Sequence, residues 1–146
     1  MSLEDWVKSG WLVRHQTSPQ EIADLLGVAD RDLATAQLPT LNTDWKLNIA
    51  YNAALQSATA ALAAAGFKAA RDAHHYRVIE SLAYTLKLDR ETINLLDTFR
   101  SKRVRSDYER AGTVSEDEAD EMLTLAEDLR RKVEAWLRAK YPGLLR

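Results

Sequence analysis

The scarcity of glycine and proline is the sequence feature that most constrains this fold. The 146 residues include five glycines and three prolines, and we interpret them as lying between periodic segments rather than inside them. Within those segments, apolar residues recur every three or four positions, which is the spacing of one face of an α-helix. The sequence therefore predicts an all-α protein, an antiparallel up-and-down helical bundle.

Capping signals divide the chain into its predicted helices. Ser18 and Ser115 each begin a capping box, in which a serine and an acidic residue three positions later cap the start of a helix. Asp89 is a further predicted N-cap, whereas Gly66 and Gly112 are predicted to end helices. The expected helices cover about residues 2–10, 18–38, 43–66, 71–86, 89–111 and 115–141.

Length, charge and cysteine content limit the classes of protein to which this chain can belong. We expect a single domain over residues 1–146, with residues 1–40 as a short N-terminal helical extension and residues 43–141 as the core of the bundle. The 20 Lys+Arg and 22 Asp+Glu residues give a net charge of −2. The chain contains no cysteine, which excludes disulfides, thiolate metal sites and a cysteine nucleophile. We expect neither a metal nor a cofactor.

The apolar segments and the N-terminus indicate where in the cell the protein is expected. The longest apolar stretch, residues 60–67, is far shorter than the ~20 residues that a membrane span requires. The N-terminus lacks the basic segment of a secretory signal. These features predict a cytoplasmic protein that does not interact with a membrane.

Charged residues interrupt the apolar face of the helix predicted at 89–111. Arg100, Arg103 and Asp107 continue the face that begins at Ile93, where apolar residues would be expected. Such charges must be paired, lie at the rim of the bundle, or face a second subunit or a ligand.

Two interpretations of these charges are open. Arg103 and Asp107 are spaced i,i+4 and can form a structural ion pair along the helix. Alternatively, the segment 98–112 forms a basic cleft, because it contains five Lys/Arg against two Asp/Glu. A cleft of that charge would suit phosphate groups.

A pair of histidines begins the helix predicted at 71–86. Adjacent helical side chains diverge, so His74 and His75 do not form a natural two-ligand metal site. His75 lies on the apolar face with Ile79. It is either a hydrogen-bonded core residue or a proton-transfer group, since its unperturbed pKa is near neutrality. We expect its ring within hydrogen-bonding distance, or one water, of Asp107 or Tyr108.

These segments together resemble a known family. The segment Phe99 to Glu109 is arginine-rich, contains Asp-Tyr near its end, and precedes a serine-capped acidic helix. In this it is similar to the HEPN-domain proteins, most closely to a small prokaryotic subgroup. The helix from Tyr51 to Gly66, aromatic and then alanine-rich, and His75 in the next helix are similar to the same subgroup. The resemblance covers about residues 45–141. It implies an up-and-down helical bundle, usually a homodimer, often encoded beside a minimal nucleotidyltransferase in a toxin–antitoxin or defence system.

The resemblance also has implications for activity. Many HEPN proteins are metal-independent ribonucleases that use an arginine and a histidine a few residues later, with the sites of two subunits facing each other. In this chain no histidine follows Arg100, Arg103 or Arg105, and Asp107 and Tyr108 occupy that region. A carboxylate beside arginines stays ionised near neutral pH and so cannot donate the proton.

Three functional hypotheses follow. The missing histidine favours a non-catalytic or degenerate HEPN-like protein, a dimeric partner or RNA-binding component of a toxin–antitoxin or defence-type system. Its RNA-binding or interface residues would be Arg100, Arg103, Arg105, Asp107 and Tyr108. The first alternative is a metal-independent endoribonuclease toxin in which His75 replaces the missing histidine. The second alternative is a structural dimerisation module.

Overall fold

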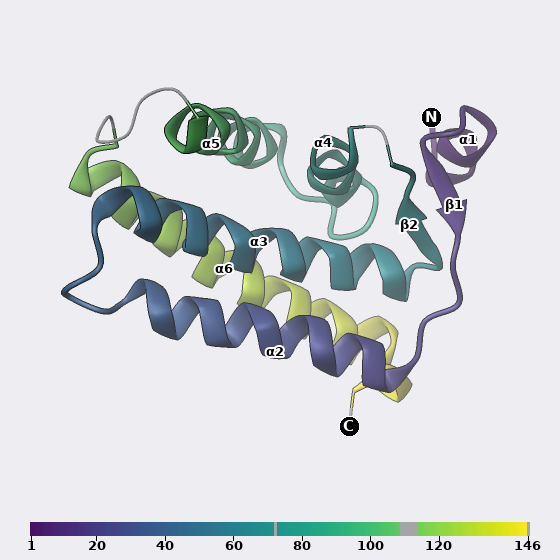
Figure 1. Cartoon of the computed structure of the whole chain (residues 1–146). Coiled ribbons are helices and arrows are strands. Elements are labelled where there is room, and N and C mark those ends of the chain that lie inside the picture. Colours follow the sequence, from purple (N-terminus) through teal and green to yellow (C-terminus); the bar gives the residue numbers. More distant parts are fainter. Residues whose placement is uncertain (72, 109–113, 146) are drawn as a thin grey trace.

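The fold is known from a computed structural model that describes residues 1–71, 73–108 and 114–145, without the side chains of residues 104–108. Helices dominate these residues (Figure 1). The elements in chain order are α1 (Leu3–Lys8), β1 (Leu12–Arg14), α2 (Pro19–Ala36), α3 (Thr43–Ala64), β2 (Phe67–Ala69), α4 (His74–Glu80), the 3₁₀ helix η1 (Ser81–Ala83), α5 (Arg90–Tyr108), α6 (Glu116–Lys140) and the 3₁₀ helix η2 (Pro142–Leu144).

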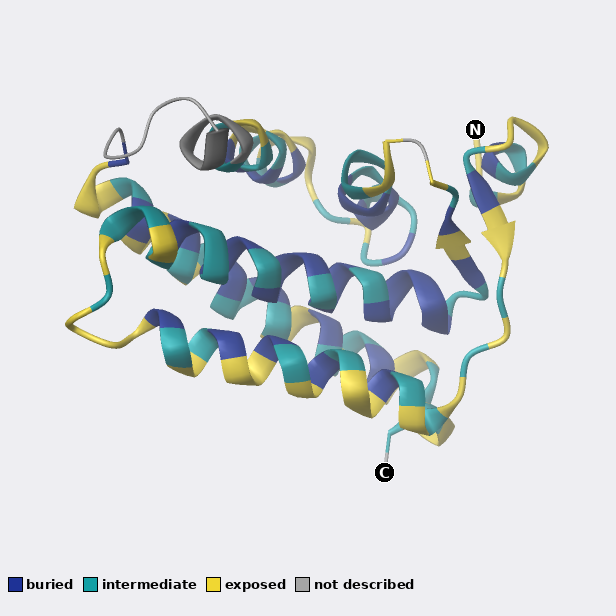
Figure 2. Cartoon of the chain, viewed as in Figure 1, coloured by how far each residue is buried: buried dark blue, intermediate teal, exposed yellow. Residues whose placement is uncertain are grey.

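Helix α3 is the centre of the bundle. Helices α2 and α6 pack along it on one side, and α4 and α5 cover the other (Figure 1). Most of its residues are buried, and many of them are alanines (Figure 2). Small side chains allow the neighbouring helices to approach closely. The predicted all-α bundle is confirmed, and the alanine-rich segment is its core helix.

Helix α2 is part of the bundle. The N-terminal extension expected over residues 1–40 includes residues 19–36. Their apolar stripe, however, packs against α3 and α6. Ile22, Leu26 and Ala29 of this stripe are buried. The bundle therefore begins at Pro19, and only α1 and β1 precede it.

Gly27 departs from the expected placement of the glycines. It lies inside α2, at an exposed position, and nothing lies within 4 Å of where a Cβ atom would be. The helix forms in spite of this glycine because its buried stripe, more than its intrinsic propensity, stabilises it.

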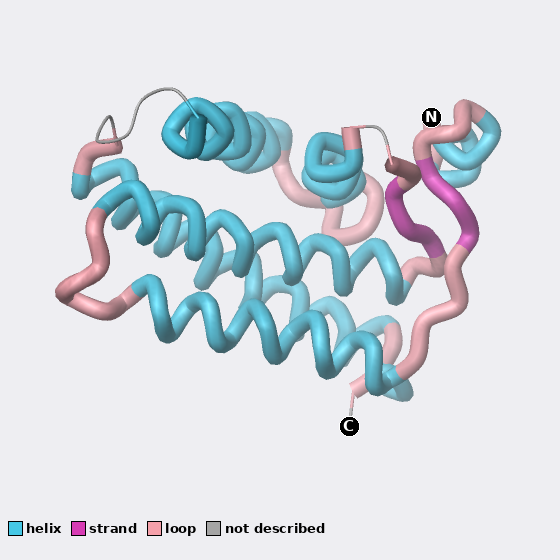
Figure 3. The backbone as a smooth tube through the Cα atoms, viewed as in Figure 1, coloured by secondary structure: helices cyan, strands magenta, loops and turns pink. Residues whose placement is uncertain are grey.

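A short antiparallel ladder of β1 and β2 was not predicted. It pairs Leu12 with Ala69 and Arg14 with Phe67, at one end of the bundle (Figure 3). Three-residue strands are too short to show the alternation of apolar and polar residues that identifies a strand. The ladder attaches the N-terminal segment to the connection between α3 and α4.

Helix α4 is shorter than the helix predicted over residues 71–86. It begins only at His74, after Ala73, whose φ of 54° lies in the left-handed region. It ends at Glu80, where the 3₁₀ helix η1 follows. Since β2 occupies residues 67–69, the chain has only a short connection in which to turn before the helix starts. His74 and His75 are consequently in its first turn.

Most of the predicted helix boundaries are confirmed. Ser115 forms a full capping box with Glu118, and Asp89 accepts a hydrogen bond from the backbone N–H of Thr92. Gly66 follows α3 with a φ of 101°, the conformation expected at a helix end. The predicted end of α5 near Gly112 lies outside the described residues.

The capping box at Ser18 is only half formed. The Ser18 hydroxyl accepts a hydrogen bond from the backbone N–H of Glu21, as predicted. The Glu21 carboxylate accepts instead from the Thr17 hydroxyl and lies 2.7 Å from His15 Nε2. Hydrogen bonds to the charged form hold the pKa of Glu21 below its usual value. These contacts of Glu21 hold His15 and Thr17, in the segment that follows β1, against the start of α2.

Candidate functional site

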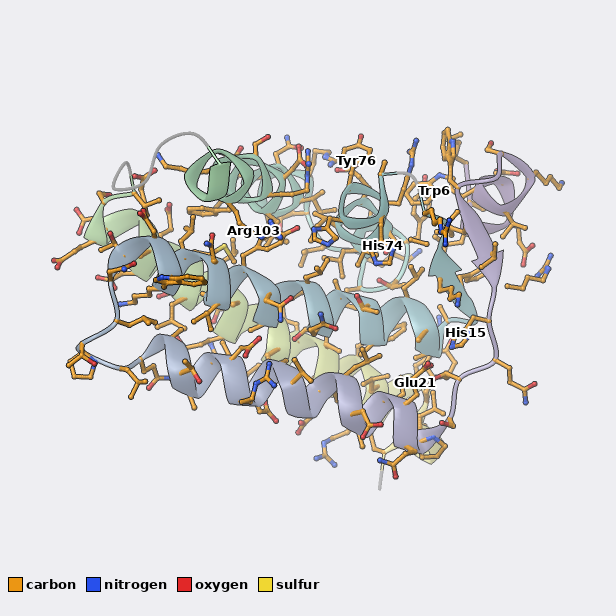
Figure 4. The ribbon with its side chains drawn as sticks, in the orientation of Figure 1. Trp6, His15, Glu21, His74, Tyr76 and Arg103 are labelled. Carbon is orange, nitrogen blue, oxygen red and sulfur yellow. The ribbon has the colours of Figure 1, made fainter. Side chains whose placement is uncertain are left out.

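Aromatic and basic side chains gather where α3, α4 and α5 meet. They are Tyr51 of α3, His75 and Tyr76 of α4, and Arg100 and Arg103 of α5, and we call them the aromatic–basic cluster. Figure 4 shows Tyr76 and Arg103 on the side of α3 that α4 and α5 cover. The cluster thus unites three of the residues singled out from the sequence, His75, Arg100 and Arg103.

Tyr51 is the buried residue of the aromatic–basic cluster that His75 and Arg103 contact. Its side chain is fully buried, and its ring centroid lies 6.1 Å from that of His75. The guanidinium carbon of Arg103 lies 5.3 Å from the Tyr51 ring centroid, within the range of a cation–π contact. Burial raises the pKa of Tyr51 to about 12, so its hydroxyl stays protonated at neutral pH.

His75 occupies the second position of α4 and is half-buried. Burial, and then the positive charges of Arg103, His74 and Arg100, lower the pKa of its imidazole below the ordinary value. Both causes disfavour the protonated ring. His75 is therefore mainly neutral at pH 7, and a neutral imidazole can accept a proton.

The two arginines lie at the rim of the bundle. The apolar face of α5 is buried at Ile93, Leu96 and Phe99, and the helix then presents Arg100 and Arg103 as partly buried residues. Lys102 is also partly buried, and the side chain of Asp107 lies outside the described residues, so the predicted charged continuation of the apolar face stays a prediction.

Contacts on α4 and α5 orient Arg100. Its Nε donates a hydrogen bond of 2.7 Å to Asp97 Oδ1, and its guanidinium carbon lies 5.7 Å from the Tyr76 ring centroid. The neighbouring Lys102 forms an ion pair with Glu118 of α6. The cationic side chains of α5 therefore diverge, and only part of the basic segment faces the cluster.

Three predicted site residues end α5. The backbone of Arg105, Asp107 and Tyr108 is helical, but their side chains lie outside the described part of the protein. The predicted contact of His75 with Asp107 or Tyr108 and the predicted ion pair of Arg103 with Asp107 lie outside it for the same reason. These contacts stay predictions.

Sequence reasoning missed two aromatic members of the cluster. Tyr51 contributes to the family resemblance but was not among the predicted site residues, and neither was Tyr76. A signal for Tyr51 was present, because a large ring that begins an alanine-rich stretch must fill a wider space on one side of the helix. Nothing in the sequence indicated that this side would be the one facing His75.

Two negative observations concern the described residues alone. They contain no group of three or more histidine or acidic side chains that could hold a metal ion. None of their helices is long and apolar enough to cross a membrane.

Comparison with known protein families identifies the class. The model of the HEPN domain matches residues 22–136, from the first turn of α2 to near the end of α6. The chain therefore belongs to the HEPN domain family, and the resemblance to this family is confirmed. Comparison with curated proteins and with solved structures gave no significant match.

Proposed function

We propose that this HEPN protein binds RNA through the aromatic–basic cluster, where Arg100 and Arg103 contact phosphodiester groups. The observation that carries the proposal is the convergence of both arginines on one site with His75, in a protein whose net charge is −2. Guanidinium groups pair with phosphate oxygens through two parallel hydrogen bonds. The Tyr76 and Tyr51 rings lie against the guanidinium groups of Arg100 and Arg103 and help to orient them.

We further propose that the protein works as a cytoplasmic homodimer within a toxin–antitoxin or defence-type system, with a nucleotidyltransferase as protein partner. Family membership and the resemblance of residues 45–141 to the small prokaryotic subgroup support this context. Sedimentation of the purified chain at micromolar concentration tests whether it forms a homodimer. A monomer there would contradict the dimer.

Binding of a fluorescein-labelled single-stranded RNA, followed by anisotropy at low salt, tests the central proposal. Arg103→Gln removes a guanidinium from the cluster and is expected to weaken binding to every RNA sequence to a similar degree, because phosphate contacts carry no sequence information. Arg131→Gln is the matched control, since Arg131 is an exposed α6 arginine paired with Asp128. Equal affinities of the two variants would contradict the proposal.

A second candidate function is RNA cleavage, and the lowered pKa of His75 beside Arg103 specifically favours it. Neutral His75 would take the proton of a ribose 2′-hydroxyl. The 2′-oxygen would then form a bond to phosphorus, the bond from phosphorus to the 5′-oxygen would break, and the leaving 5′-oxygen would take a proton from water. Arg103 would stabilise the charge on the phosphoryl oxygens. His75 would finally lose its proton to solvent.

The products distinguish the two functions. Cleavage would yield a 2′,3′-cyclic phosphate and a 5′-hydroxyl, and His75→Ala would abolish it while leaving the oligomeric state unchanged. Binding without any cleavage, in both the unmodified protein and the His75→Ala variant, would leave RNA binding as the sole function of the cluster.

A further inference from the structure

We infer that a groove beside the aromatic–basic cluster binds a nucleobase of the same RNA strand by stacking on Trp45. This inference rests on the proposed function, because it adds a base-binding subsite to a phosphate-binding one. The groove lies between α2, α3 and α5 and encloses about 600 Å³. Its lining includes Trp45, Asn48 and Asn52 of α3, together with Arg31 of α2 and Arg103 of α5.

Trp45 is the residue that indicates a flat aromatic ligand. It is 58% exposed, an unusual state for a tryptophan. Its position is nonetheless fixed, because it lies in the first turn of α3 and its backbone N–H donates to the Asn42 cap. An exposed indole on a rigid helix presents a face on which a base can stack.

Amide side chains stand beside Trp45 on the same face of α3. Asn48 and Asn52 follow it at the i+3 and i+7 positions, so all three line one groove. Asn52 Nδ2 donates to Asp32 Oδ2 at 2.7 Å, and Asn52 Oδ1 accepts from Gln56 at 3.2 Å. After these two bonds the Asn52 carboxamide retains one N–H donor and one carbonyl lone pair, the kinds of group that the edge of a base requires.

The acidic member of the groove does not make it repel RNA. Asp32 is only 7% exposed, and it accepts hydrogen bonds from Asn52 and from Arg31 Nε at 3.1 Å. The Arg31 ion pair offsets its charge. A strand entering the groove therefore encounters a neutralised carboxylate and, on the opposite wall, Arg103.

Arg103 links the groove to the aromatic–basic cluster. Its guanidinium lies over Tyr51 in the cluster, and the same residue lines the groove. A phosphate held at Arg103 would therefore place a flanking nucleotide in the groove with Trp45. The base must be unstacked from its neighbours to meet the indole, so the expected ligand is single-stranded RNA. The lining combines charged and amide side chains with the apolar surfaces of Trp45 and Ile49, a mixture that suits a nucleotide, which has both a charged backbone and an aromatic base.

The test compares Trp45→Ala with Trp45→Phe in the full chain. The probe is a fluorescein-labelled oligouridylate of about ten nucleotides, a length within the range that one single-strand site covers. Trp45→Ala should weaken binding by about 5-fold to 150-fold, the range found for loss of one stacked base. Trp45→Phe keeps a ring and should lose much less. Neither variant should change the salt dependence of binding, since neither removes a positive charge.

Two further readouts make the test specific for the base. An oligomer of the same length with abasic residues should bind the unmodified protein more weakly than oligouridylate, and Trp45→Ala should bind both probes equally. Oligouridylate should also quench the intrinsic fluorescence of the unmodified protein, and Trp45→Phe should lose that quenching. Trp136→Phe is the control that should keep it, because Trp136 packs against Tyr141 at the end of α6.

Each other outcome overturns the inference. If RNA binding depends on Arg103 but Trp45→Ala binds like the unmodified protein, the groove is not a subsite and the proposed function still holds. If no RNA binds at low salt, both are wrong. If Trp45→Ala dissociates a dimer and leaves RNA affinity unchanged, the groove is a subunit interface.

Discussion

Arg103 places its guanidinium carbon 5.3 Å from the centroid of the Tyr51 ring. This contact joins α5 to the central helix at the point where His75 approaches from α4, with its ring centroid 6.1 Å from the same tyrosine. One buried ring therefore organises the basic side chains of two other helices. The lowered pKa of His75 follows from this arrangement, because burial and the charge of Arg103 act on the same imidazole.

The hydroxyl of Tyr51 contributes little to the stability of the fold. Among the described residues it is buried without a hydrogen-bond partner, and an unsatisfied buried polar group costs about 1–3 kcal/mol. Tyr51→Phe should therefore unfold at the same or a higher urea concentration, with a gain of at most ~1–3 kcal/mol. Tyr51→Ala should lose about 3–5 kcal/mol, because it leaves a large cavity in the core. A marked loss of stability in Tyr51→Phe would show that the hydroxyl has a partner.

His75 should make the stability of the protein depend on pH below neutrality. Its pKa is lower in the folded protein than in the unfolded chain, so the unfolded chain binds more protons between the two pKa values. The free energy of unfolding should consequently fall as pH drops through the ordinary histidine pKa of about 6.5 towards the lowered value. Above about pH 7 this contribution vanishes.

Denaturation at pH 7.5 and at pH 5 checks this prediction. His75→Gln keeps a polar side chain of similar size that does not titrate, and it should lose less stability between the two pH values than the unmodified protein. Equal losses in both proteins would assign the pH dependence to other groups.

Gly27 offers a simple route to a more stable protein. An alanine at this exposed position inside α2 meets no atom within 4 Å. Because glycine in a helix interior is about 0.5–1 kcal/mol less favourable than alanine, Gly27→Ala should raise the free energy of unfolding by that amount. Urea denaturation measures it, and a loss of stability would contradict this prediction.

The sequence predicted the helices well where their signals are local. Ser115 and Asp89 cap helices as their side chains indicated, and Gly66 follows α3 as expected. The short β1–β2 ladder was beyond such reasoning. It depends on pairing between Leu12 and Ala69, residues far apart in the sequence, and neither strand is long enough to have a pattern of its own.

The candidate site was predictable only in part. The helical phase of α5 placed Arg100 and Arg103 on its apolar face, and that of α4 placed His75 on the apolar face with Ile79. The packing of the bundle decides which side of α3 these helices cover. The sequence therefore did not indicate that Tyr51 would contact His75 and Arg103. Trp45 was missed for a related reason. Its exposure depends on the space left between α2 and α5, which one helix alone does not define.

The salt dependence of RNA binding tests the central claim most directly. Each phosphate contact in a single strand adds about 0.7 to the slope of log affinity against log salt concentration. The double variant Arg100→Gln, Arg103→Gln should therefore bind with a slope smaller by about 1.4 than that of the unmodified protein. A slope equal to that of the unmodified protein would contradict the claim that these two arginines of α5 hold the RNA backbone.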